Sequence, residues 1–375
     1  MIDDPRALAC VITAATALAF WLERHVPWAG KIGASLLVIL IGALLSNFGV
    51  VAHTSPVYDA ISGPLTSLAI VWLLLAIDLR SVRAAGPRMI VAFAVAVFAT
   101  AVGAATAALV WQDAFPNDAW RLAGVMTGTY SGGGLNFVSV GRAVGLSDSL
   151  FAAAAAADNL MTGMWMGATL VLPIWLRHLY PARKLARDPA ASVDTFTTSL
   201  LASPLRIFDV LVLLALGFAV ILLAEAMRHV VPSVPTVLWI TTFALGAGQV
   251  PGLRKLAGAL PLGLLCLNLF FVVIGIGSRV AEIARVGIEV FWFTALVVGI
   301  HGLITFTLAR ALRLDAETTA VASQAAVGGP STAMALATAR GWGDLALPGL
   351  LVGLAGYAVG NYAGLAIAHL MRKVL

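Results

Sequence analysis

Charged residues are scarce in this sequence. Asp, Glu, Lys and Arg together make up only 11% of its 375 residues, against about 25% in soluble domains. Hydrophobic residues make up 61%, and the mean hydropathy is +0.97. Apolar runs of about 20 residues, long enough to cross a bilayer, recur along the whole chain. This composition excludes a soluble protein, so we expect a multi-pass protein of a bacterial inner membrane, surrounded by lipid.

Cysteine and catalytic motifs are also scarce. The two cysteines, Cys10 and Cys266, lie in apolar runs, where cysteine behaves as a small hydrophobe rather than as half of a disulfide. The sequence offers no metal-ligand cluster, nucleotide-binding loop or nucleophile–base pair, so we expect neither an enzyme nor a cofactor. The net charge of +5 comes from basic residues in short loops, where they set membrane orientation. We therefore expect no nucleic-acid partner.

Ten apolar segments can span the membrane. They are roughly residues 7–22, 32–52, 60–78, 89–111, 149–175, 205–226, 235–250, 257–278, 286–309 and 345–371. Two further apolar segments, 121–145 and 318–341, are interrupted by glycine or proline, so neither is expected to form one continuous helix. Because Asp3 and Asp4 precede the first segment where a secretory signal would be basic, we expect that segment to be a retained helix.

The same order of elements occurs twice. Four spans, one interrupted segment and one span are followed, after a polar stretch, by the same series. The register agrees as well, since Gly132 matches Gly328 at an offset of 196 and Gly163 matches Gly360 at 197. The predicted fold is an all-α membrane protein with two inverted structural repeats, each with about five spans and one glycine-broken segment. The predicted domains are an N-terminal transmembrane repeat, a cytoplasmic linker and a C-terminal transmembrane repeat, at residues 1–175, 176–204 and 205–375.

Loop charge predicts the orientation. Basic residues follow the first and third spans and fill the linker, which places these loops in the cytoplasm and the N-terminus outside. The segment 121–145 then begins and ends on the outer side as a re-entrant hairpin, and its counterpart 318–341 enters from the cytoplasm, so that the two tips meet. Against this, Arg279, Arg285, Arg372 and Lys373 would lie outside. A broken helix that crosses the membrane therefore remains the alternative to a hairpin.

The first interruption predicts a binding site. Irregular backbone at membrane depth is tolerated only where it is buried in protein or lines an aqueous cavity. A half-helix that starts after the glycines would direct free N–H groups at an anion, whereas carbonyls before them could hold a cation. Glycines that serve only close helix packing are the alternative. The predicted substrate-binding residues of this segment are Ser131, Gly132, Gly133, Gly134 and Asn136.

The second interruption lies at the matching position of the other half. Proline fits the first turn of a half-helix because its missing N–H would be unpaired there in any case. Paired breaks in corresponding places are a sequence indication of a transport site. The predicted substrate-binding residues here are Gly328, Gly329, Pro330, Ser331 and Thr332. Gln324 is predicted to contribute to a coupling-ion site, with a hydrogen bond between helices as the alternative.

Asp158 is a carboxylate about one-third of the way through a span. An ionisable residue at such depth is taken as functional by default. We expect Asp158, with Asn159 and Gln324, to bind the coupling ion, either Na⁺ or H⁺, with carbonyls of the first break completing a sodium site. A structural hydrogen bond between helices is the alternative role for Asp158.

Four stretches carry a family resemblance, at residues 130–137, 157–159, 322–333 and 356–362. They resemble the bacterial and plant family catalogued as domain of unknown function 819, over nearly the whole chain. That family is similar in plan to cation–proton antiporters, anion transporters and bile-acid-type sodium symporters. The resemblance implies a core domain that carries the broken segments and moves against a scaffold. Antiporters often show adjacent acidic residues, whereas Asn159 follows Asp158 here, which disfavours two-carboxylate exchange.

The predicted function is secondary active transport. We expect sodium- or proton-coupled symport of a small organic anion or amino-acid-like solute, with alternating access of the elevator type. A cation–proton antiporter and a holin-like export channel are the alternatives. We also expect a homodimer. Alanine at Gly133 or Gly329 should harm transport more than alanine at Gly42, which the sequence presents as an ordinary glycine of a span.

Overall fold

The described parts of the chain are helical. The computed structural model describes residues 1–183, 205–254, 256–278 and 280–375, and most of the predicted linker therefore lies outside the described residues. Among these residues, eight helices are long and apolar enough to cross a membrane, and Ala34–Asn47 and Thr236–Gly248 are shorter apolar helices. These two sets account for the ten predicted spans. The one extended contact in the described parts is a bridge between Ile2 and Val51.

The helices of the N-terminal half are α1 (Pro5–His25), α2 (Pro27–Ile32), α3 (Ala34–Asn47), α4 (Pro56–Ala60), the π-helical turn Ile61–Leu65, α5 (Thr66–Leu75), the 3₁₀ turn Ser81–Ala85, α6 (Pro87–Val110), α7 (Ala119–Thr129), α8 (Gly134–Ala143), α9 (Asp148–Leu176) and the 3₁₀ turn Arg177–Leu179. Those of the C-terminal half are α11 (Ile207–Val230), α12 (Thr236–Gly248), α13 (Pro251–Arg254), α14 (Ala259–Gly277), α15 (Val280–Ala311), α16 (Ala316–Ala339) and α17 (Gly343–Val374).

Side-chain caps and prolines fix where several helices begin. Asp4 accepts hydrogen bonds from the backbone N–H groups of Arg6 and Ala7 at the start of α1, and Asp315 accepts one from Thr318 at the start of α16. These bonds satisfy N–H groups that have no partner within the helix. Proline occupies the first turn of α1, α2, α4 and α6, where it costs no hydrogen bond.

The helices α7 and α8 form a helical hairpin. Gly364 of α17 lies against Gly124 and Gly128 of α7, and also against Val140 of α8. In a continuous helix, residues 128 and 140 would be about 18 Å apart. They meet at one place on α17, so the two arms must run side by side in opposite directions. The hairpin, rather than a broken crossing helix, is the geometry of this segment.

The helix α16 turns back on itself in the same way. Its one residue with non-helical geometry is Gly329, at φ 82° and ψ −172°. Val321 before this break and Ala333 after it both pack against Gly349 of α17. A straight helix would again separate these two residues by about 18 Å. The second glycine-broken segment is therefore also a hairpin, with Gly329 at its tip.

The two hairpins enter the protein from opposite ends, and their tips meet in its interior. The base of the first lies beside the end of α17, where the Arg372 guanidinium is 5.3 Å from the Trp120 ring centre. The base of the second lies at the start of α17, where Asp315 and Asp344 line one pocket. A Cβ on Gly133 would come within 3.8 Å of Gly329 Cα. The tips are thus in contact, as the sequence predicted.

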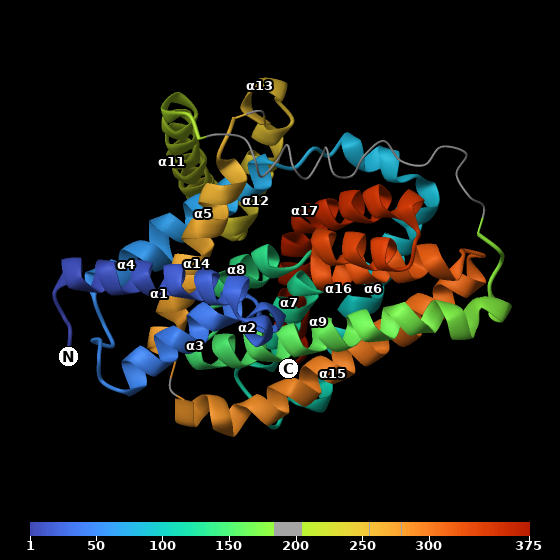
Figure 1. Ribbon diagram of the computed structural model, residues 1–375, viewed down its shortest axis with the longest axis horizontal. Helices are drawn as coiled ribbons and strands as arrows, with labels where there is room; N and C mark the ends of the chain where they lie inside the picture. Colours follow the sequence, from blue (N-terminus) through green and yellow to red (C-terminus); the bar gives the residue numbers. More distant parts are fainter. Residues whose placement is uncertain (184–204, 255, 279) are drawn as a thin grey trace.

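The helices form two bundles that are visible in Figure 1. The flanking bundle comprises α1, α3, α5, α11, α12 and α14, and the hairpin bundle comprises α6 to α9 and α15 to α17. Contacts within each bundle are extensive, whereas the bundles meet chiefly where α9 reaches α14 and α12 reaches α17. In Figure 1, α5, α11, α12 and α14 stand at the left, and α16, α17 and α6 at the right. Each bundle combines helices from both halves of the sequence.

The first hairpin makes a topological prediction. In a variant without the exposed Cys10, we introduce single cysteines at Asn117 and Asp148, which flank the hairpin. Both should react with a membrane-impermeant maleimide on intact cells, because both ends of a re-entrant hairpin face one side. The control is Leu312→Cys at the base of the second hairpin, which should react only after permeabilisation. Labelling of Asn117→Cys and Asp148→Cys from opposite sides would contradict the hairpin.

Candidate functional site

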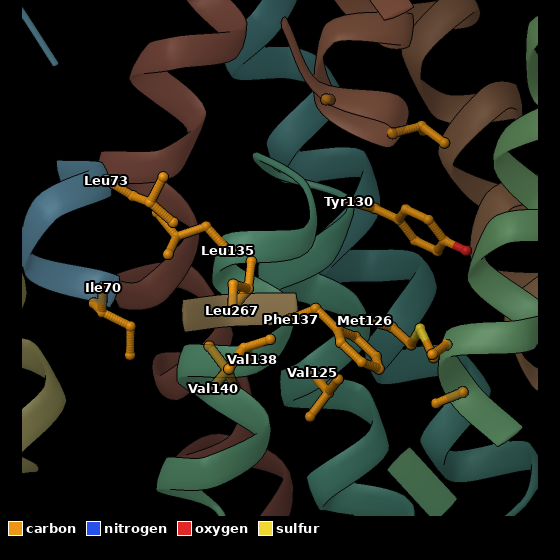
Figure 2. Packing of buried hydrophobic residues seen from close by; sticks show 14 of the residues in the cluster. Ile70, Leu73, Val125, Met126, Tyr130, Leu135, Phe137, Val138, Val140 and Leu267 are labelled. Carbon is orange, nitrogen blue, oxygen red and sulfur yellow. The ribbon is translucent and has the colours of Figure 1, made fainter. Parts of the chain in front are cut away.

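A cavity of about 460 Å³ lies between the two bundles, at the hairpin tips. The hairpin bundle contributes Gly133, Gly134 and Leu135 from the first tip, Gly328, Ser331 and Thr332 from the second, and Asp158, Asn159 and Thr162 from α9. The flanking bundle contributes a mostly apolar wall, from Ser35 and Ile39 of α3, Leu73 of α5 and Ile77 just after it, and Leu264, Leu267 and Phe271 of α14. Figure 2 shows Leu73, Leu135 and Leu267 close together beside the first tip. Seven of the thirteen predicted site residues thus line one cavity.

The first tip depends on the absence of side chains. Gly133 has φ 101°, which disfavours any residue with a Cβ. A Cβ on Gly132 would lie 2.3 Å from the carbonyl of Gly356 on α17, so the backbones approach too closely for alanine. The Asn136 side chain donates to the Gly356 carbonyl at 2.9 Å and fastens the tip to the same point.

Two half-helices begin at the cavity. The helix α8 starts at Gly134 without a side-chain cap, and the second arm of α16 starts at Pro330. Uncapped helix starts expose N–H groups and carry the positive end of the helix dipole. Ser331 and Thr332 add hydroxyl groups at the second start. The tips can therefore hold an anionic group without a basic side chain; none of the described lining residues is Lys, Arg or His.

Asp158 is the one carboxylate among the described lining residues. It is half-buried on α9, and Thr162, one turn later, donates from its hydroxyl to Asp158 Oδ1 at 3.4 Å. Asn159 donates to the Ala155 carbonyl of its own helix at 2.8 Å. The structure thus brings a negative charge to the same cavity as two positive helix ends.

The remaining predicted residues lie behind the cavity. Ser131 is fully buried and donates to the Thr127 carbonyl at 2.6 Å. Gly132 and Asn136 fasten the first tip, Gly329 contacts the Gly132 carbonyl, and Pro330 packs against Gly353. Gln324 faces Thr169 of α9. These six residues do not line the cavity and instead shape the two tips that do.

The sequence analysis missed several residues at this site. Thr162 follows Asp158 by four residues, which places both on one helix face and was readable from spacing. Tyr130 could be found only from the structure. Its hydroxyl is buried and has no hydrogen-bond partner of normal geometry among the described residues. The charged group that interacts electrostatically with this hydroxyl is the Asp158 carboxylate. Figure 2 shows its ring directed away from Leu135, Val138 and Val140 of α8.

A buried polar network lies next to the tips. His301 of α15 contacts the Thr100 hydroxyl through Nδ1 and the Ser323 hydroxyl through Nε2, both at 2.8 Å. The Thr100 hydroxyl also donates to the Tyr130 carbonyl at 2.9 Å. His301 therefore joins α6, α15 and α16 behind the first tip.

The expectation for Gly42 was wrong. A Cβ on Gly42 would come within 2.3 Å of the Val272 carbonyl, because α3 and α14 cross there with their backbones in close contact. Hydropathy patterns cannot reveal such a contact, since the partner residue is about 230 positions away in the sequence. A Cβ added to Gly163 of α9 would meet nothing within 4 Å. Gly163→Ala is therefore the suitable control for alanine at Gly133 or Gly329.

Hydrogen bonds join the two bundles on one side of the cavity. Its flanking wall comes from the start of α3, the end of α5 and the first half of α14, next to the basic loops predicted to be cytoplasmic. At the other end, Ser278 donates to the Asp148 carbonyl at 3.0 Å, and Asn47 donates to the Ser278 carbonyl at 3.0 Å. The Phe151 and Phe270 rings meet edge to face nearby. These contacts join α9, α14 and α3 on the side that the loop charges place outside.

Comparison with known proteins agrees with the architecture. The family described as protein of unknown function (DUF819) matches residues 10–374. The chain is also similar to the uncharacterized membrane protein YjcL of Bacillus subtilis, with 25% identity over 385 residues and 96% of each chain covered. A match that spans nearly every helix of a polytopic protein identifies its family, and this chain is a member of the DUF819 family of membrane proteins.

Proposed function

We propose that this protein is a secondary active transporter that couples uptake of a small organic anion or amino-acid-like solute to Na⁺ or H⁺. The observation that carries the proposal is the meeting of two re-entrant tips and one carboxylate at a single cavity. Half-helix N-termini suit the anionic group of a solute, and a carboxylate at membrane depth suits a coupling cation. A second copy of the chain is the proposed partner, in a bacterial inner membrane.

The proposed motion is a displacement of the hairpin bundle against the flanking bundle. The polar residues of the cavity belong almost entirely to the hairpin bundle, whereas the flanking wall is mostly leucine, isoleucine and phenylalanine. An apolar wall makes few directional bonds, so a moving bundle can slide along it. The bundle that moves would carry the whole binding site with it.

We further propose that the two halves are inverted repeats. In the order of the repeat, α3 corresponds to α12, and α5 corresponds to α14. The helix α3 packs on α14, and their counterparts α12 and α5 also pack on each other, which supports the proposal. The hairpins that enter from opposite ends support it as well. An inverted pair can exchange conformations, so the arrangement seen at one side of the membrane in one state appears at the other side in the next.

The cavity favours a solute transporter over the alternatives. A volume of about 460 Å³ far exceeds the needs of a bare cation and lies within the usual range for small-molecule sites. The contacts between Asp148, Ser278 and Asn47 join the two bundles on one side, which fits a transporter with alternating access better than an open pore.

Uptake driven by an ion gradient tests the proposal. The purified protein is reconstituted into proteoliposomes. Radiolabelled organic acids and amino acids are added outside, with an inward Na⁺ gradient, an inward H⁺ gradient or neither. The expected result is saturable accumulation of at least one solute under one gradient only. Solute-independent proton movement on addition of cation would support the antiporter instead, and flux that never saturates would support a channel.

A further inference from the structure

Three side chains lie against Gly328 at the end of the first arm of α16, and a fourth, Asp158, contacts one of them. The position of a Cβ on Gly328 lies 2.3 Å from Thr332 Oγ1, 2.7 Å from Gln324 Nε2 and 3.0 Å from the Thr162 methyl group. The Thr162 hydroxyl, on the same side chain, reaches Asp158 Oδ1 at 3.4 Å. Because residue 328 has no side chain, these groups approach its backbone closely, and Asp158, Thr162 and Thr332 also line the cavity.

The Gln324 amide is the least satisfied group of this cluster. It is fully buried, and its nitrogen has no hydrogen-bond partner among the described residues. Its oxygen lies 3.1 Å from the Thr169 hydroxyl. That hydroxyl has one proton, and the carbonyl of Trp165, at 3.0 Å, can take it. Thr169 can therefore accept a hydrogen bond from Gln324 at no cost to its own.

A half-turn of the Gln324 side-chain amide gives its nitrogen a hydrogen-bond partner. It exchanges oxygen and nitrogen without changing the shape of the side chain. The nitrogen then donates to Thr169, and the oxygen points at Gly328 and Thr332. After this turn, the cluster offers oxygen atoms from one carboxylate, two hydroxyls and one amide, with the Thr162 hydroxyl directed at Asp158 and its methyl group at Gly328.

We propose that Asp158, Thr162, Gln324 and Thr332 form a binding site for a single monovalent alkali cation, Na⁺ in the cell. The proposal rests on the proposed function, because this cation would be the coupling ion. It keeps Asp158 and Gln324 from the sequence prediction and replaces Asn159 and the carbonyls of the first break with Thr162 and Thr332. Hard cations prefer ligand sets made of oxygen.

Charge balance selects a monovalent ion. The cluster carries one carboxylate and neutral oxygens, so Na⁺ leaves no net charge, whereas Ca²⁺ would leave one positive charge buried and unpaired. The first arm of α16 ends at the cluster, and the negative end of its dipole also favours a cation. Thr332 lines both the cluster and the cavity, so the ion and a solute at the tips would share this residue.

Thermal unfolding of the purified protein tests the site without a known solute. Stability is measured against NaCl at constant ionic strength, with choline chloride as replacement, and again with KCl. The variants are Thr162→Val and Thr332→Val, which each remove one oxygen and keep the shape, and Thr162→Ser, which restores the oxygen. The control is Thr106→Val on α6, whose hydroxyl donates to Val102 of its own helix.

The wild-type protein should be stabilised by Na⁺ and not by choline. The half-saturating Na⁺ concentration should rise at least about tenfold in both valine variants, about 1.4 kcal/mol for a lost ligand, and return to near the wild-type value in Thr162→Ser. Unchanged sodium affinity in both valine variants would overturn the proposed site, as would stabilisation by choline equal to that by Na⁺. Either result leaves the transporter proposal intact if uptake by the wild-type protein follows an ion gradient. Absence of gradient-driven uptake in the wild-type protein would instead contradict the proposed function.

Discussion

Asp158→Asn should abolish ion-coupled transport while the protein remains folded. The carboxylate is the only one among the described residues that line the cavity. A lone carboxylate at membrane depth must be neutralised by a bound cation or a proton. Removing one partner of a buried ion pair costs about 3–5 kcal/mol, or more than about 100-fold in ion affinity. The amide has the same shape and can still accept from Thr162, so the fold has little reason to change.

The assay is solute accumulation in proteoliposomes under each ion gradient, beside sodium-dependent thermal stability. If Asp158 binds Na⁺, the variant loses both stabilisation by Na⁺ and accumulation driven by Na⁺. If it carries a proton, Na⁺ has no effect on either protein and the variant loses accumulation driven by H⁺. Wild-type ion dependence in both assays would return Asp158 to a structural role. Gly163→Ala is the matched control on the same helix, because an added Cβ there would meet nothing within 4 Å.

Gly356→Ala should separate the first hairpin tip from α17 and inactivate the protein. A Cβ at this position would lie 2.3 Å from the Ser131 carbonyl and 2.7 Å from Gly132 Cα. Both are backbone atoms, so no side-chain rotation can relieve the overlap. Overpacking of this kind costs about 1–3 kcal/mol, and here the tip must also give up its hydrogen bond from Asn136 to Gly356.

The matched control is Gly343→Ala on the same helix, where the added Cβ meets nothing within 4 Å. Thermal stability and gradient-driven uptake of the two variants are compared after purification in the same detergent. Gly343→Ala should match the wild type in both. Equal behaviour of Gly356→Ala would mean that the tip and α17 need not touch in the functional protein.

The sequence predicted the hairpins because their signals are local. Consecutive glycines at 132–134 and the glycine pair before Pro330 interrupt apolar segments, and charge in the neighbouring loops places the ends of each segment. Asp158 was identifiable for a similar reason, as a carboxylate inside a span. These features depend on residues close together in the chain.

Features that depend on distant partners were missed. The close crossing of α3 and α14 at Gly42, the contact of Gly132 with Gly356 and the position of Gln324 beside Thr169 each join residues far apart in sequence. No local pattern records such a pairing. The family resemblance implied a core and a scaffold, but the helices that make up each were hidden, because each bundle takes helices from both halves while the repeat divides the chain in the middle.

The contact between the first hairpin and the last helix sets an order of events during synthesis. Asn136 and the carbonyl it binds at Gly356 are 220 residues apart. At about 5–20 residues per second, roughly 10–45 s pass between their emergence from the ribosome. Until α17 arrives, the Asn136 amide cannot make this bond, and lipid offers it no replacement. We therefore expect the nascent chain to keep this hairpin out of the hydrocarbon, at the membrane surface or within the insertion machinery, until translation is almost complete.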